Sequence, residues 1–161
     1  YYDLKLSKLF IITGNDNYVL SYDYNDDIIY YKYSDNDKDI DEINPHDSII
    51  MINDAQIVKM IESSEDGNIR IWDFHHGLLL KKIFVSECKI YGICLWNNNF
   101  LFATCNDKSL KIIDLKREAI INNMIEDTTI ICIKTALHPI YGKCLVTQDW
   151  RNQIKLWANK F

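Results

Sequence analysis

The stretch Ser63-Ser-Glu-Asp-Gly-Asn-Ile-Arg-Ile-Trp-Asp73 decides the fold of this chain. The polar residues at its start predict a tight turn in which Gly67 adopts a positive φ. After this turn, isoleucines alternate with Arg70 and Trp72, which is the pattern of a β-strand. A second turn at 75–77 leads into another apolar run. One segment therefore predicts two turns and the strands that they connect.

The same pattern returns twice further along the chain. Residues 104–114 repeat it with Ile113 where Trp72 stands, and residues 147–157 repeat it with a tryptophan, Trp157. The spacing from Trp72 to Ile113 is 41 residues, and the spacing from Ile113 to Trp157 is 44. Propeller blades of four strands repeat about every 40–45 residues. We interpret the pattern as an internal repeat.

These repeats resemble the WD40 family, well over residues 44–158 and weakly over residues 1–43. The resemblance implies an all-β fold of propeller blades, each with four antiparallel strands, that serves as a binding platform. About four units are visible, each expected to begin with an outer strand. Their approximate bounds are 1–34, 35–74, 78–115 and 119–158.

The number of blades leaves three interpretations open, because rings of this family usually have about seven. The chain is part of a longer propeller, a propeller completed by a partner chain, or a closed four-bladed ring. The absence of an initial Met favours a fragment. In the first unit, Tyr31–Asp35 aligns with Ile69–Asp73. Tyr2–Leu6 is the expected closing strand, since a terminal strand commonly closes such rings.

Charge and composition limit the function classes. The net charge of -5 argues weakly against nucleic acid as the main partner. Acidic residues crowd into 34–47, which we expect to be a solvated loop or, alternatively, a docking site for a basic partner. No apolar run is long enough to cross a membrane, and no signal peptide is recognisable.

The five cysteines are odd in number and contain no Cys-x-x-Cys pair, so neither a disulfide framework nor a zinc site is indicated. They lie in apolar, strand-like surroundings. We expect reduced core thiols, in a cytoplasmic or nuclear protein.

The resemblance implies a structural network within each blade. A His before the first strand, a hydroxyl on the second, an Asp in the turn and a Trp on the third would be joined by hydrogen bonds. In the second unit, a direct alignment puts Glu62 at the hydroxyl position. The expected members are His46, Ser63, Ser64, Asp66, Trp72, Thr104, Asp107, Thr147 and Trp157.

The resemblance also implies that partners bind at a rim, formed by the turns between second and third strands and the turns that enter the inner strands. Trp150, beside an arginine in a polar turn, has the character of an interface anchor. The alternative is that it folds back between blades. The expected rim residues are Glu65, Asn68, Asn106, Lys108, Trp150, Arg151 and Asn152.

No catalytic, cofactor-binding or metal-binding residue is expected. His75 and His76 are adjacent in a predicted turn and are interpreted as surface histidines, and no phosphate-binding loop is present. We expect a non-enzymatic scaffold that binds other proteins, including a chain that completes the propeller. The alternative is an RNA- or ribonucleoprotein-associated subunit that uses Arg70, Lys81, Lys82, Lys111, Lys116, Arg117 and Lys155.

Overall fold

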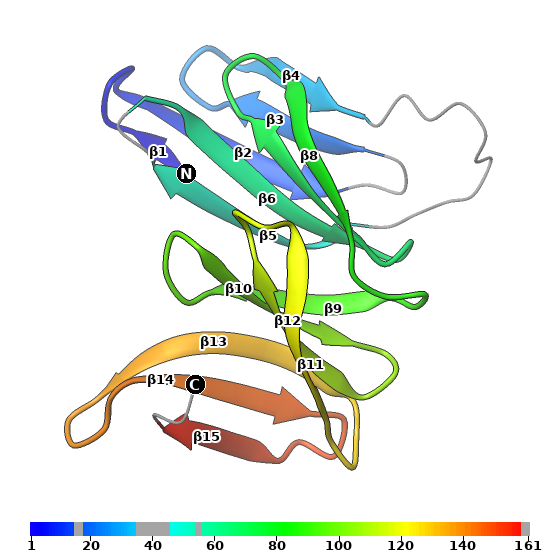
Figure 1. The fold of residues 1–161 in the computed structure, drawn as a ribbon. Helices are drawn as coiled ribbons and strands as arrows, with labels where there is room; N and C mark the ends of the chain where they lie inside the picture. Colours follow the sequence, from blue (N-terminus) through cyan, green and yellow to red (C-terminus); the bar gives the residue numbers. More distant parts are fainter. Residues whose placement is uncertain (15–17, 35–45, 54–55, 159–161) are drawn as a thin grey trace.

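The computed structural model describes residues 1–14, 18–34, 46–53 and 56–158. Within these residues every regular element is a β-strand, and the strands form four antiparallel sheets (Figure 1). The prediction of an all-β chain is therefore confirmed. The described part of the chain has no helix with the length and apolar character needed to cross a membrane.

The strands follow the chain order within each sheet, and each is antiparallel to its neighbour. Sheet 1 contains β1 (Tyr2–Asp3), β2 (Lys8–Gly14), β3 (Val19–Asp23) and β4 (Ile28–Tyr33). Sheet 2 contains β5 (His46–Asn53), β6 (Val58–Ser64), β7 (Asn68–Asp73) and β8 (Leu78–Phe84). Sheet 3 contains β9 (Ile90–Leu95), β10 (Phe100–Cys105), β11 (Ser109–Asp114) and β12 (Ala119–Ile125). Sheet 4 contains β13 (Ile130–His138), β14 (Gly142–Asp149) and β15 (Ile154–Ala158).

The sheets succeed one another from the blue N-terminal sheet to the orange and red C-terminal sheet (Figure 1). One apolar cluster fills each junction between consecutive sheets. Trp72 and Phe10 lie between sheets 1 and 2, Ile61 lies between sheets 2 and 3, and Phe102 lies between sheets 3 and 4. Burial of apolar surface in these three clusters therefore holds the sheets together.

Gly67 has the positive φ that the sequence predicts, with a value of 72°. A Cβ atom there would lie 1.7 Å from the carbonyl oxygen of Ser86. The Gly67 carbonyl accepts hydrogen bonds from the N–H groups of Val85 and Ser86 at 3.0 and 3.1 Å. Only glycine fits, because both the left-handed backbone and the close approach exclude a side chain.

The turn after Trp72 also recurs. Asp73 Oδ1 accepts hydrogen bonds from the N–H groups of His75 and His76 at 3.1 and 3.2 Å, and Gly77 follows with a φ of 65°. An aspartate that accepts two N–H groups in this way fixes a turn locally. The same arrangement is found at Asp3, Asp23 and Asp114.

The register of sheet 1 differs from the expected alignment. Tyr22 pairs with Ile29 on β4, just as Trp72 pairs with Leu79 on β8, and the aspartate that follows each of them pairs with the adjacent residue of the same strand. In both sheets the irregularity in the ladder falls directly before the aromatic residue. The alignment of Tyr31–Asp35 with the Trp-Asp strand is therefore wrong, and β4 is the outer strand. Tyrosine in place of tryptophan concealed the repeat.

The closing-strand prediction for Tyr2–Leu6 is also wrong. β1 pairs with β2 through Tyr2 opposite Leu9 and Asp3 opposite Lys8, so it belongs to sheet 1. Within the described residues, sheet 4 has three strands, and β15 pairs only with β14. The predictions for the acidic segment at 35–45 and for the side chain of His46 lie outside the described residues.

Candidate functional site

The two blade tryptophans donate hydrogen bonds to equivalent positions on the neighbouring strand. Trp72 Nε1 donates to Glu62 Oε1 at 3.3 Å, and Trp157 Nε1 donates to Thr147 Oγ1 at 2.8 Å. In sheet 3 the equivalent position, 41 residues after Glu62, is Ala103. The bond in sheets 2 and 4 satisfies the indole N–H in a largely apolar junction.

The serines expected in the network of Trp72 are both buried at the end of β6. Ser63 Oγ is buried and has no hydrogen-bond partner among the described residues, and Ser64 is buried where β6 enters its turn. Thr104 Oγ1 donates to the carbonyl of Gly92 at 3.3 Å, within sheet 3. The structure thus joins Trp157 to Thr147, whereas Trp72 donates to Glu62 and Thr104 bonds the Gly92 carbonyl.

The turn aspartates are held by a basic residue four positions later. Asp66 pairs with Arg70 at 2.5 Å, and Asp107 pairs with Lys111 at 3.3 Å. Burial raises the pKa of both carboxyl groups, but hydrogen bonds from neighbouring residues outweigh it and leave each pKa below its ordinary value. These aspartates stay ionised and stabilise their turns.

Five residues form a continuous surface at the turns of sheets 2, 3 and 4, which we name the rim platform. Glu65 pairs with Lys89, and the Lys89 ammonium lies 5.4 Å from the centre of the Tyr91 ring. The Tyr91 ring meets Trp150 edge to face at 6.0 Å, and its hydroxyl donates to Asn106 Oδ1 at 3.2 Å. Trp150 remains 59% exposed while its ring contacts Tyr91 of sheet 3.

The rim platform contains predicted and missed residues. Lys89 directly precedes β9 and Tyr91 is the second residue of that strand. Both were missed, although they follow a turn that enters an inner strand. Of the other predicted rim residues, Lys108 and Asn152 have φ values of 65° and 60°. Arg151 is exposed, and its N–H donates to Asp149. The side-chain amide of Asn68 donates to the Asp66 carbonyl. Local turn geometry accounts for these four residues.

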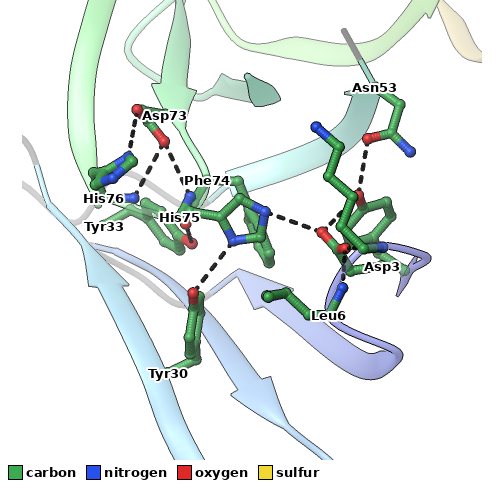
Figure 2. A network of polar contacts seen from close by, with 11 residues as sticks. Asp3, Leu6, Tyr30, Tyr33, Asn53, Asp73, Phe74, His75 and His76 are labelled. Atoms are coloured by element: carbon green, nitrogen blue, oxygen red, sulfur yellow. Dashed lines mark hydrogen bonds and ion pairs between the residues drawn. The ribbon is translucent and has the colours of Figure 1, made fainter. Parts of the chain in front are cut away.

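A polar network joins sheets 1 and 2 at the end of the strands that lies opposite the rim platform (Figure 2). His75 Nε2 lies 3.0 Å from Asp3 Oδ2, and His75 Nδ1 lies 3.2 Å from the hydroxyl of Tyr30. The His75 side chain is only 23% exposed, so the prediction of a surface histidine is wrong for this residue. Burial raises the pKa of Asp3, but two backbone N–H groups and His75 leave it below its ordinary value. The network ties the two sheets together.

The outer face of sheet 4 is apolar and uncovered by any other described sheet. Val146 pairs with Leu156, and Ile154 lies on the same face. Ile154 is 74% exposed and Leu156 is 42% exposed. The equivalent positions in sheets 2 and 3 face the next sheet and are buried, and they are occupied by Ile61, Ile69, Ile71, Phe102, Leu110 and Ile112.

The cysteines differ in exposure. Cys94, Cys105 and Cys144 are buried, as expected of core thiols, whereas Cys132 is exposed. Cys132 pairs with Gln148, which pairs with Ile154, so its side chain shares the outer face of sheet 4. The expectation of core thiols is therefore wrong for Cys132, because no described sheet covers this face.

Comparisons with known proteins identify the fold. No family model matches the chain, and no curated protein matches its sequence. Among solved structures, the computationally designed Ika4 protein aligns with a TM-score of 0.67 at 12% identity, over 92% of this chain and 84% of that one. The WD40 β-propeller domain of Doa1 aligns with a TM-score of 0.74 at 15% identity, over 99% of this chain and 49% of that one.

The chain therefore has the fold of consecutive β-propeller blades, and its structure is similar to a WD40 propeller. It spans about half the length of the Doa1 chain with which it aligns. Within the described residues, no group of three or more His, Cys, Asp or Glu side chains is arranged to hold a metal ion.

Proposed function

We propose that this chain is a non-enzymatic, WD40-type scaffold that assembles a protein complex through the outer face of sheet 4 and the rim platform. The outer face of sheet 4 is the observation that carries the proposal. It presents Val146, Ile154 and Leu156 at positions that are buried in the two preceding sheets. An apolar face of this kind marks an interaction site.

The chemistry of the face defines the partner. Each complete sheet of the chain has an outer strand hydrogen-bonded to its third strand, as β8 is to β7. In sheet 4 the third strand is β15, and no other described strand pairs with its outer edge, so a strand of a partner protein can pair there. A partner that supplies an edge strand and an apolar sheet face would complete the blade and cover Leu156.

The ion pairs weigh against the RNA alternative. Several of the basic residues proposed for RNA binding already pair with carboxylates of this chain. Arg70 pairs with Asp66, Lys111 with Asp107, and Lys155 with Glu126. Charges neutralised in this way contribute less to phosphate binding. No described feature specifically favours RNA as the partner.

Alkylation of Cys132 tests the proposal, because this thiol lies on the face in question. We expect Cys132 to react with iodoacetamide in purified protein and to be protected in a native cell extract. The buried Cys105 serves as the control, since burial raises its pKa to about 11 and it should react in neither sample. Equal reactivity of Cys132 in both samples would argue against a covered face.

A photo-crosslinking residue at position 156 then identifies what covers the face. The proposal expects cross-links to a second polypeptide, and none from the same residue at Ile121, which is exposed on β12. Cross-links confined to the protein's own polypeptide would overturn it, because the face would then be covered within one chain.

A further inference from the structure

A cavity of about 400 Å³ opens between sheets 2 and 3, at the end of the strands opposite the rim platform. Its walls come from β5 to β8 and from the turns that follow β9 and β11. The volume lies within the range of about 300–1,000 Å³ that is usual for ligand pockets. The described lining residues are Ile52, Lys59, Ile61, Ile71, Leu80, Lys81, Asn98, Asn99, Leu115 and Lys116.

The lining combines an aliphatic floor with a basic mouth. Ile61, Ile71 and Leu115 are buried and form part of the floor. Three lysines and two asparagines surround it, and the described lining residues include no carboxylate and no aromatic ring. One of the lysines, Lys81, donates to the Leu115 carbonyl at 3.3 Å and pairs with Glu118 at 2.5 Å.

The basic lining is specific to this junction rather than a general result of stacking blades. The position of Lys59 in sheet 2 is occupied by Phe10 in sheet 1 and by Phe100 in sheet 3. Each of these residues pairs with the aspartate that begins the turn after the third strand of its sheet. Between sheets 1 and 2, Phe10 packs against Tyr30 with ring centres 4.8 Å apart. Two of the three junctions thus carry a phenylalanine where this one carries a lysine.

The junction between sheets 3 and 4 contains the equivalent pocket. It is smaller, about 220 Å³, and its lining is mainly apolar. Ile121 stands where Leu80 stands, because both are the unpaired residue of their ladder, and the residue equivalent to Lys81 is Asn122. The described lining consists of Trp96, Asn97, Phe100, Phe102, Ile112 and Ile121.

We propose that the cavity between sheets 2 and 3 binds an acidic peptide segment that carries an aliphatic side chain. The aliphatic side chain would sit on Ile61 and Ile71. Flanking Asp or Glu residues would meet the lysines at the mouth, and the amides of Asn98 and Asn99 would bond the peptide backbone. This site is separate from the rim platform and does not depend on the scaffold proposal.

A peptide fits this cavity better than a single-stranded nucleic acid. Proteins that bind single strands stack bases on aromatic side chains, and the described lining offers only aliphatic side chains as an apolar surface. An aliphatic floor with lysine side chains at its mouth, one of which (Lys81) already pairs with Glu118, instead complements a carboxylate next to a Leu or Ile side chain.

The test is an NMR titration of the protein with a set of short synthetic peptides. Each peptide has a central Leu or Ile flanked by Asp or Glu, and concentrations reach about 1 mM. We expect shifts of the Asn98 and Asn99 side-chain amides with at least one peptide. We also expect weaker binding at higher salt, because the contacts are partly exposed.

Matched variants separate the cavity from general charge. Lys116→Gln and Arg117→Gln each remove one positive charge from the same turn, but only Lys116 lines the cavity. We expect Lys116→Gln and Lys59→Gln to weaken peptide binding about two- to fivefold each, and Arg117→Gln to change it less than twofold. Equal losses for Lys116→Gln and Arg117→Gln would overturn the proposal.

Two further outcomes would also overturn it. One is the absence of shifts at Asn98 and Asn99 with every peptide. The other is displacement of the peptide by single-stranded RNA in a manner that depends on Lys116, which would assign the cavity to nucleic acid instead.

Discussion

The junction between sheets 1 and 2 and the junction between sheets 2 and 3 use equivalent strand positions but are filled differently. In the first, Phe10 packs against Tyr30 and Phe74, with ring centres 4.8 and 5.2 Å apart. The Asp3–His75 contact closes its end (Figure 2). In the second, Lys59 stands at the position of Phe10, and a cavity of about 400 Å³ remains.

This difference separates two tasks that the same repeat can perform. Aromatic rings bury a large area and pack at fixed angles, so the first junction holds two sheets in one arrangement. A lysine buries its stem but keeps its ammonium group near water, so the second junction keeps an opening. The repeat thus determines where a cavity can form, and single positions change its size and its lining.

The largest expected effect is that of Trp72→Ala in the aromatic junction. Trp72 is buried, its ring centre lies 5.8 Å from that of Tyr33, and its N–H bonds Glu62. Loss of the indole should lower the free energy of unfolding by about 3–5 kcal/mol, since it creates a cavity and leaves Glu62 without this donor. Chemical denaturation measures the loss. A change below about 1 kcal/mol would show that the junction repacks around the gap.

A smaller effect is expected when Lys59 receives the side chain found at its two equivalents. Lys59→Phe should raise the free energy of unfolding by about 1 kcal/mol, because the ring would fill part of the cavity with apolar surface. The same variant should lose the binding of acidic peptides. Denaturation and the peptide titration give the two readouts. Unchanged stability together with unchanged binding would contradict the equivalence of the two junctions.

Asp3→Asn tests the polar end of the aromatic junction by its pH dependence. The pKa of Asp3 is lower in the folded chain than its ordinary value. The ionised carboxylate therefore contributes stability that is fully present above about pH 4 and is lost as the pH falls through the lowered folded pKa. Asp3→Asn should remove about 1 kcal/mol at neutral pH and less in acid.

The control for Asp3 is Asp114→Asn. Asp114 accepts the same two turn N–H groups but has no histidine among its recorded partners. Unfolding curves of both variants between pH 7 and pH 2 should show the larger pH-dependent loss for Asp3→Asn. Identical curves would show that the contact with His75 does not contribute to the stability of this junction.

The smallest effect on stability is expected at the rim platform, outside both junctions. Trp150→Ala should change the free energy of unfolding by less than about 0.5 kcal/mol, because the side chain is 59% exposed. Binding of a protein partner, measured by calorimetry once the partner is known, should weaken by about 2 kcal/mol. A large loss of stability would instead make Trp150 a packing residue between sheets 3 and 4.

The fold could be predicted because its main determinants are local. Gly67 identifies a turn by its backbone requirement, and the alternation around Ile69 and Ile71 identifies a strand with a buried face. Trp72 and Trp157, spaced by whole repeats, identify the blades. The repeat alignment failed in residues 1–34, where Tyr22 takes the tryptophan position and the described turns have Ser7 and Asp27, not glycine, at positive φ.

Side-chain partners were harder to predict because they depend on register between strands. A shift of one residue moves a side chain to the other face of a sheet. Glu62 rather than Ser63 therefore receives the hydrogen bond of Trp72. The rim platform was partly predicted, since turns can be located in a sequence, but Tyr91 joined Trp150 only through the contact of sheets 3 and 4.

The sequence by itself determined the repeat, the strands and the positions of the turns, because these follow from short-range periodicity and backbone preferences. Only the tertiary structure decided which faces are covered. Ile154 and Ile69 occupy equivalent positions, yet one is 74% exposed and the other is buried. Likewise, Lys59 becomes the wall of a cavity only when sheet 3 lies opposite it. Whether a strand residue is buried depends on the sheets that pack against it, so the residues of that strand alone do not determine it.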